Sequence, residues 1–153
     1  MKDKAVLISI RPKYIELIVN REKRLEFRRS WPALPVSGLI IYACAPLKKI
    51  VAVAEIRTVI WGSRTKLWHA AQEMGGGVTR QALFDYLDGK KNAAAIELVK
   101  VQSIAGGLDP KKLFGQEFRP PQSFRYIDKE TFSKIMNLIK KDKNYHLKSR
   151  DRK

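Results

Sequence analysis

The chain has 153 residues, 44% of them hydrophobic, and its 31 lysines and arginines against 15 acidic residues give a formal charge of +16. This length favours one domain with its own core, and no stretch approaches the roughly 20 apolar residues that cross a bilayer, so we expect no membrane association. The charge indicates a polyanionic partner, of which nucleic acid fits best.

The first part of the sequence predicts strands separated by one short helix. Residues 5–10 form an apolar run typical of a buried strand, and residues 12–20 begin with a proline, which suits the first turn of a helix. Two prolines in residues 31–35 favour an extended connection. The runs 39–44 and 49–60 are rich in Val, Ile and Ala, which predicts a twisted antiparallel sheet.

Two short helices and another strand are expected next. Ser63 and Thr79 are typical N-caps, and three glycines at 75–77 end the first helix. This pair looks like an insertion across the sheet. Residues 93–104 return to strand, which we expect Gly106 and Gly107 to break.

The C-terminal part predicts a loop, a strand and a helix. Residues 109–121 are expected to form a long ordered loop, and residues 124–127 the last strand. Asp128 then caps a helix with apolar residues at helical spacing. We expect a single domain over residues 1–140 and a basic, flexible tail over residues 141–153.

Cysteine and histidine usage excludes several chemistries. The chain has one cysteine, Cys44, so no internal disulfide forms, and its two histidines lack companions at metal-ligand spacing. We therefore expect no metal, no cofactor and a cytoplasmic protein. A small buried thiol in an apolar run is the ordinary reading of Cys44.

One segment concentrates charge on a predicted strand, residues 24–28. Alternation directs its two apolar residues toward the core and its charged residues to the opposite face. Such a row binds a polar planar group or a phosphate, or sets an ammonium beside a carboxylate for proton transfer. The alternative is an ordinary solvated face. The charged residues are Arg24, Glu26 and Arg28, with Lys23 at the entrance to the row.

Three segments resemble the ASCH domain of the PUA-like superfamily. They are residues 9–14 (Ser-Ile-Arg-Pro-Lys-Tyr), residues 22–28 (Glu-Lys-Arg-Leu-Glu-Phe-Arg) and residues 120–124 (Pro-Pro-Gln-Ser-Phe). The resemblance covers roughly residues 4 to 140. It implies an α+β fold, a PUA-like/ASCH incomplete β-barrel of about six mostly antiparallel strands with flanking helices.

The resemblance also implies binding of RNA or a nucleoside-like ligand in a basic cleft. Glu26 is expected to accept from a base amino group, Arg28 to hold Glu26 in place, and Lys23 to meet a phosphate or carbonyl oxygen. We also expect flat side chains for base stacking beside this cleft. The further candidates are Arg29, Trp31, which we expect near the surface, Tyr42, expected on a neighbouring strand, and Ser123, for which capping of a turn is favoured.

Three alternatives stay open. Some small ASCH proteins are amidohydrolases acting on N4-acetylcytidine, and their motif resembles Gly-x-Lys-Thr-x-Thr-x-Arg. Their lysine falls on Lys23, but the attacking threonine falls on Glu26, and their glutamate aligns loosely with Glu73. Those three residues form the candidate catalytic set. A metal-free ribonuclease using Arg28 and Tyr42 as well, or a basic adaptor without chemistry, fits the sequence too, and the oligomeric state is left open.

Overall fold

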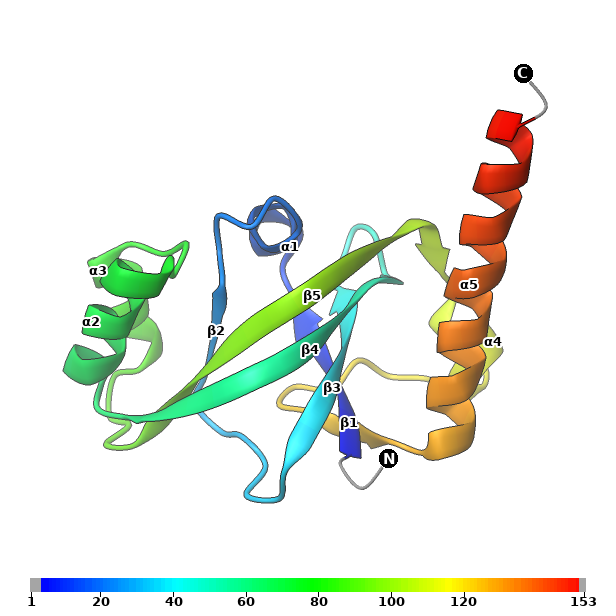
Figure 1. Cartoon of the computed structure of the whole chain (residues 1–153). Helices are drawn as coiled ribbons and strands as arrows, with labels where there is room; N and C mark the ends of the chain where they lie inside the picture. Colours follow the sequence, from blue (N-terminus) through cyan, green and yellow to red (C-terminus); the bar gives the residue numbers. More distant parts are fainter. Residues whose placement is uncertain (1–3, 152–153) are drawn as a thin grey trace.

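A single curved sheet organises the computed structural model, which describes residues 4–151, with side chains described as far as Lys141. The strand order is β2-β5-β4-β3-β1-β6. Helices interrupt the strands in chain order (Figure 1). The strands are β1 (Lys4–Ile10), β2 (Leu25–Arg28), β3 (Val36–Ala43), β4 (Lys49–Gly62), β5 (Ala93–Leu108) and β6 (Arg125–Ile127). The helices are α1 (Pro12–Val19), α2 (Arg64–Met74), α3 (Arg80–Tyr86), α4 (Pro110–Phe114) and α5 (Lys129–Asp151).

The sheet is mixed and does not close. β1 pairs with β3 in parallel, and the other neighbouring strands pair antiparallel. β2 and β6 are the two edges of the strand order. The long β4–β5 ribbon crosses the whole molecule in Figure 1. The predicted incomplete barrel of six mostly antiparallel strands is therefore confirmed.

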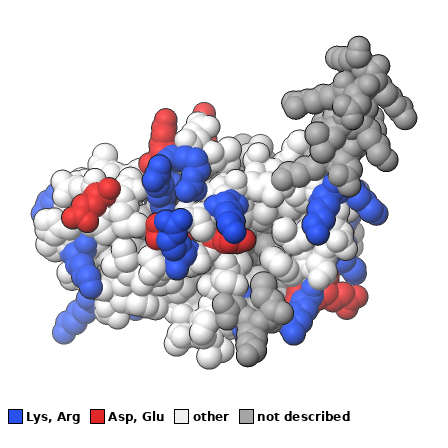
Figure 2. Space-filling view, viewed as in Figure 1, with Lys and Arg blue, Asp and Glu red and all other residues white. Residues whose placement is uncertain are grey.

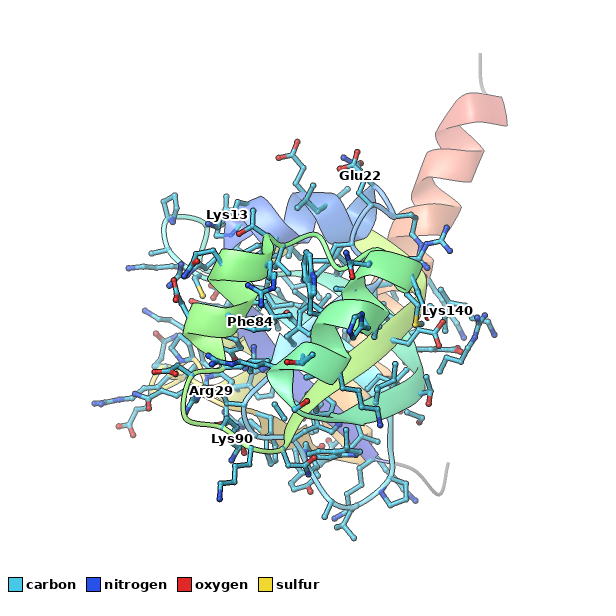
Figure 3. All side chains as sticks on the ribbon, turned by 90° about the vertical axis from the view of Figure 1, so that its left-hand side faces the viewer. Lys13, Glu22, Arg29, Phe84, Lys90 and Lys140 are labelled. Carbon is cyan, nitrogen blue, oxygen red and sulfur yellow. The ribbon has the colours of Figure 1, made fainter. Side chains whose placement is uncertain are left out.

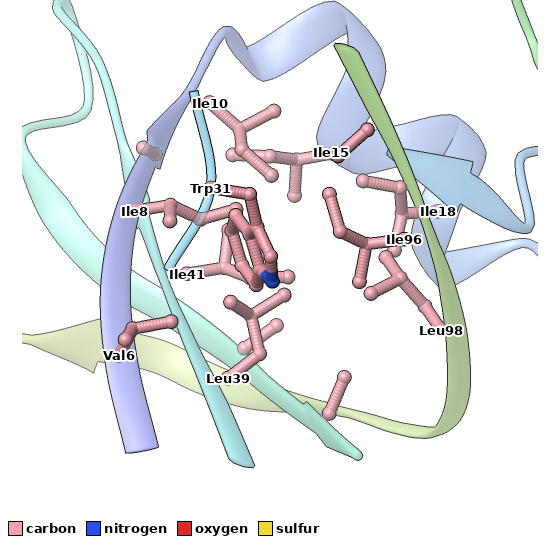
Figure 4. Packing of buried hydrophobic residues seen from close by; sticks show 14 residues of the cluster. Val6, Ile8, Ile10, Ile15, Ile18, Trp31, Leu39, Ile41, Ile96 and Leu98 are labelled. Atoms are coloured by element: carbon pink, nitrogen blue, oxygen red, sulfur yellow. The ribbon is translucent and has the colours of Figure 1, made fainter. Parts of the chain in front are cut away.

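Alternation along the strands builds a core on the inner face of the sheet. Val6, Ile8 and Ile10 of β1 pack there, whereas Ala5 and Leu7 belong to a cluster on the other face. Helix α1 covers the inner cluster with two aliphatic side chains, as Figure 4 shows. Burial of such side chains contributes about 1.5–3 kcal/mol each, so α1 is fixed by the face it buries. The residues that α1 contributes are Ile15 and Ile18.

The outer face carries helices at its two ends. Helix α5 packs Ile135 and Ile139 against β1 and β3. Helices α2 and α3 cover Leu25 and Phe27 of β2 at the other end. Ser63 and Thr79 cap these two helices as predicted, because their hydroxyls accept the Lys66 and Ala82 amides at 3.2 and 3.1 Å. The two ends of the β4–β5 ribbon are thus held by separate apolar clusters.

Two predicted boundaries are wrong. β5 continues through Gly106 and Gly107 to Leu108, which pairs with Ile50, because the strand accommodates both glycines at positive φ. The predicted loop after residue 109 contains α4, whose N-cap Asp109 accepts the Lys111 amide at 2.9 Å. An aspartate before a proline is an N-terminal helix signal that outweighed the loop composition.

Helix α5 crosses the boundary expected at residue 140. The Asp128 cap is confirmed by its carboxylate, which accepts the Thr131 amide at 2.7 Å. The backbone stays helical to Asp151, so no change of secondary structure marks the tail. Its flexibility stays a prediction, and residues 152–153 lie outside the described part. Within residues 4–151, no helix is long and apolar enough to span a membrane.

Candidate functional site

A cavity of about 530 Å³ opens between α1, β2 and α3. This volume lies within the range of small-molecule sites. Its wall combines the end of β1, the start of α1, the charged strand and the last turn of α3. The lining residues include Ser9, Arg11, Lys13, Tyr14, Lys23, Glu26, Phe27, Arg28, Asp85 and Tyr86.

Strand β2 brings its charged row to the inner face of the barrel. Among the described strands it pairs with β5 alone, and Glu26 and Arg28 lie opposite Ile96 and Ala94, two residues of the inner core. The alternation predicted for this strand is confirmed, but its second face is not solvated. Glu26 and Arg28 are 7% and 8% exposed and Lys23 is 1% exposed. These are the buried polar or charged residues among those that the structure describes.

Lys23 is enclosed by aromatic rings and a glycine turn. Its ammonium donates to the Gly76 carbonyl at 2.6 Å and lies 5.3 and 4.8 Å from the ring centroids of Tyr14 and Phe27. The stem of Lys23 packs against Gly77, where a Cβ would come within 2.7 Å of the lysine Cβ. Burial lowers the pKa of the Lys23 ammonium, and the charge of Glu26 opposes that shift.

The lowered pKa of Lys23 predicts a pH-dependent stability. Between that folded-state pKa and the usual 10.5, the unfolded chain binds a proton that the folded chain has lost. The free energy of unfolding therefore rises with pH across this window, and below it the buried ammonium destabilises the fold by its full amount. Lys23→Met should remove this rise. In urea denaturation, the free energy of unfolding of wild type should therefore increase relative to that of the variant between pH 7 and 10.5.

Lys100→Met is the matched control for that measurement. Lys100 is an exposed lysine whose ammonium lies 3.4 Å from the Glu55 carboxylate. Lys100→Met keeps the buried ammonium of Lys23, so its free energy of unfolding should rise with pH in parallel with that of wild type. A wild-type advantage over Lys23→Met that stays constant from pH 7 to 10.5 would contradict the buried-ammonium assignment.

Arg28 joins segments that are distant in the sequence. Its guanidinium donates to the Ser9 carbonyl at 3.3 Å and to the Ser123 carbonyl at 2.5 Å. The Ser9 hydroxyl in turn donates to the Pro121 carbonyl at 2.9 Å. Residues of all three segments that carry the family resemblance therefore meet beside the cavity.

Glu26 is not held by Arg28, contrary to expectation. Within the described chain no ion pair joins the two, because Arg28 is committed to carbonyls of β1 and of the segment before β6. One carboxylate oxygen of Glu26 accepts a hydrogen bond from the backbone amide of Phe27 at 3.1 Å. The second oxygen has no recorded partner there, so it remains available to a ligand. Arg24, expected in the same row, is exposed and does not line the cavity.

Two aromatic candidates lie elsewhere. Trp31, expected near the surface, is 8% exposed and packs in the inner core, since the extended segment after β2 folds it inward. Tyr42, expected on a strand next to β2, lies on β3, which neighbours β4 and β1. Tyr42 is 4% exposed, and its ring contacts that of Phe118 with centroids 5.5 Å apart. Burial raises the pKa of Tyr42, and Cys44 adds to the shift.

The remaining candidates surround the cavity or lie apart from it. Arg29 is exposed and donates to the carbonyls of Tyr86 and Asp88 at 2.8 and 2.9 Å. Ser123 is exposed and contributes the carbonyl that Arg28 binds. Glu73 is exposed on α2 and is absent from the cavity wall, so the candidate catalytic set does not meet there.

Sequence reasoning missed the aromatic wall of the cavity. Tyr14 lies within the first matched segment and faces the cavity from α1, which a helical projection of residues 12–19 indicates only after the sheet is placed. Tyr86, 44% exposed, reaches the cavity from the end of α3, and no local pattern marks it. Among the described residues, no group of His, Cys, Asp and Glu has the arrangement of a metal site.

The fold and cavity define an α+β domain in which an incomplete barrel carries a charged cavity at one end. No family model matches the chain. A curated protein of Zymomonas mobilis, described as an ASCH domain-containing ribonuclease, is 32% identical over 137 residues, which are 88% of this chain and 92% of that protein. The chain therefore belongs to the ASCH domain family.

Solved structures agree with this assignment. The crystal structure of ASCH from Zymomonas mobilis matches with a TM-score of 0.79 and 29% identity, covering 88% of this chain and 95% of that one. Structures of a serine-to-alanine and a tyrosine-to-phenylalanine variant of the Zymomonas mobilis protein match with TM-scores of 0.78 and 0.76, each at 29% identity and 88% of this chain. They cover 96% and 98% of those chains.

Proposed function

We propose that this ASCH domain binds RNA and takes one nucleotide into the cavity beside β2. The observation that carries the proposal is the burial of Lys23, Glu26 and Arg28 around one 530 Å³ cavity. Charged groups are costly to bury and are retained mainly where they have partners or a function. The Zymomonas mobilis relative, described as a ribonuclease, makes RNA the favoured ligand.

The proposed contacts follow from the hydrogen-bonding groups of the cavity wall that can still bind a ligand. Glu26 offers a carboxylate oxygen to the amino group of a base, and Lys23 offers an ammonium to a carbonyl or phosphate oxygen. Tyr14 lines the same wall and supplies a flat ring for a base that has left its stack. Arg28 acts by positioning, because its bonds to two carbonyls shape the wall.

Glu26→Gln tests the cavity as the RNA reader. The neutral amide keeps the shape of the side chain but presents donors as well as an acceptor, so preference among RNA sequences should fall about tenfold, the cost of one good base contact. Fluorescence anisotropy with labelled single-stranded RNAs, each ending in a different base, measures this across a salt series.

Glu73→Gln is the matched control, since Glu73 is an exposed glutamate outside the cavity wall. A chain ending after Lys140 separates the contribution of the basic tail, which should change affinity and salt dependence without changing preference. Unchanged preference in Glu26→Gln would remove the cavity as the reader.

RNA cleavage is the second candidate, favoured by the description of the relative as a ribonuclease. Burial lowers the pKa of Lys23, and in its neutral form this amine would take a proton from an attacking hydroxyl while a cation nearby stabilises the charged phosphate. Hydroxyls are also candidates, because the relative has solved serine and tyrosine variants. The variants to assay on end-labelled RNA with chelator present are Lys23→Met, Ser9→Ala, Ser123→Ala, Tyr14→Phe and Tyr42→Phe.

Amide hydrolysis on N4-acetylcytidine stays a prediction. By the resemblance, the attacking threonine falls on Glu26, and the serine hydroxyl in the cavity wall, that of Ser9, already donates to the Pro121 carbonyl. Conversion of N4-acetylcytidine to cytidine, followed by chromatography against a Lys23→Met control, decides it.

A further inference from the structure

Three arginine side chains contact α3, the helix that forms one wall of the cavity. The guanidinium carbons of Arg64 and Arg80 lie 4.7 and 4.1 Å from the centroid of the Phe84 ring. Arg29, which follows β2 directly, donates to the Tyr86 carbonyl in the last turn of the same helix. We call Arg29, Arg64 and Arg80 the arginine cluster.

Part of this arrangement is structural, since cations stabilise the carbonyl end of a helix. A guanidinium nevertheless carries five N–H donors. The hydrogen bonds recorded for Arg29 and Arg64 use one nitrogen of each, Nη1, and none is recorded for Arg80 within the described chain. Arg64 contacts the cluster's recorded acidic partner, Asp88, at 3.4 Å, and that carboxylate is 80% exposed. Positive charge and unused donors therefore remain for a ligand.

The cluster differs from the charged face of the β4–β5 ribbon. On the ribbon Arg57 lies 3.3 Å from Glu97, and Lys100 lies 3.4 Å from Glu55. Figure 2 shows this face, where blue and red side chains alternate over the ribbon instead of forming one basic patch. An anion therefore finds more uncompensated positive charge near α3 than on the ribbon.

Tyr86 joins the cluster to the cavity. Its side chain lines the cavity wall and is 44% exposed, so the ring is accessible to a base at the mouth. In Figure 3, which looks onto α2 and α3, Lys13, Phe84, Arg29 and Lys90 follow one another down the α3 side. Lys13 also lines the cavity. The helix that carries Tyr86 is thus contacted by Arg29 at its C-terminal end, and a further cation, Lys13, lines the same cavity as the tyrosine ring.

We propose that Tyr86 and the arginine cluster form a strand-binding subsite that continues the cavity. The phosphates of a single-stranded RNA contact the arginines, the base next to the recognised nucleotide stacks on Tyr86, and the recognised nucleotide enters the cavity. The substrate class is then a single-stranded RNA segment and not a free nucleoside, an inference that rests on the proposed function. Cationic grooves with stacking platforms are how proteins follow single strands.

Arg80→Gln and Tyr86→Ala test the subsite with an unstructured, labelled eight-nucleotide RNA and with its mononucleotide as competitor. Arg80→Gln should weaken binding of the octamer and lower the slope of log affinity against log salt by about 0.7, the loss of one phosphate contact on a single strand. Tyr86→Ala should weaken it about tenfold, and Tyr86→Phe should restore binding because the ring is kept. Mononucleotide competition should be unchanged by Arg80→Gln.

Arg125→Gln is the matched control. Arg125 also holds its guanidinium over an aromatic ring, at 4.6 Å from the centroid of Phe114, on the far side near α4. The Arg125→Gln substitution removes the same charge from the same kind of contact as Arg80→Gln. Equal losses in Arg80→Gln and Arg125→Gln would overturn the subsite in favour of diffuse charge, as would equal binding of an eight-base-pair duplex or an octaglutamate peptide.

The two proposals fail in different ways. Loss of sequence preference in Glu26→Gln together with full octamer binding in Arg80→Gln and Tyr86→Ala would retain the cavity and overturn the subsite. Absence of octamer binding by wild type would overturn both. Circular dichroism and thermal melting of each variant confirm that the fold is intact, which is expected since Arg80 and Tyr86 are exposed.

Discussion

Gly77→Ala should lower the free energy of unfolding by about 2–4 kcal/mol. Gly77 has φ of +65°, a conformation that costs an alanine about 1 kcal/mol, and the added Cβ would lie 2.7 and 2.9 Å from Cβ and Cγ of Lys23. Overpacking of this kind adds about 1–3 kcal/mol because the stem of a buried side chain has little room to move. Urea denaturation of wild type and variant at neutral pH measures the difference.

Gly89→Ala isolates the backbone contribution. Gly89 has φ of +76°, but a Cβ there meets no atom within 4 Å. Its substitution should cost about 1 kcal/mol. Adding Lys23→Ala to Gly77→Ala should recover part of the loss by removing the crowded stem beyond its Cβ. Equal costs at the two glycines would show that the Lys23 contact is not what makes residue 77 sensitive.

Arg28→Met should cost about 3–6 kcal/mol and weaken RNA binding together with stability. Methionine retains the apolar stem but removes two charge-assisted hydrogen bonds, to the Ser9 and Ser123 carbonyls, and each such bond contributes about 1.5–3 kcal/mol. The segment before β6 would lose its link to β2, so hydrogen exchange should quicken around residues 120–124. Chemical denaturation and amide exchange are the measurements.

Arg57→Met serves as the control for this loss. The guanidinium of Arg57 is largely exposed and makes one ion pair, with Glu97, on the outside of the ribbon. Exposed pairs of this kind are worth about 0–1 kcal/mol. If Arg28→Met were no more costly than Arg57→Met, or if exchange in residues 120–124 stayed slow, Arg28 would not be the link between the three segments.

Much of the fold could be predicted because it depends on local signals. The caps Ser63, Thr79 and Asp128 each bind a backbone amide as their residue types predict. Alternation in β2 was also predictable, because the face of Leu25 and Phe27 follows from period two alone. Helix α4 was missed because a five-residue helix gives little periodicity.

The candidate site was predictable in part. The resemblance placed Lys23, Glu26 and Arg28 together, and the structure lines one cavity with them. Strand alternation could not say that both faces of β2 are buried, since this depends on α1 and α3 packing from regions distant in sequence. Trp31 was misplaced for the same reason: a tryptophan next to arginines looks exposed until the chain folds it into the inner core.

Separation of the two ends of the sheet has a practical consequence. Helix α5 packs on the cluster around Ile40 and Ile135, at the end of the ribbon opposite α2 and α3 in Figure 1, whereas the cavity is lined by α1, β2 and α3. A tag or surface linker joined at the C-terminus would therefore be attached away from the cavity. Immobilisation through that end should present the opening to solution, which makes it the better choice for capturing RNA on a sensor surface.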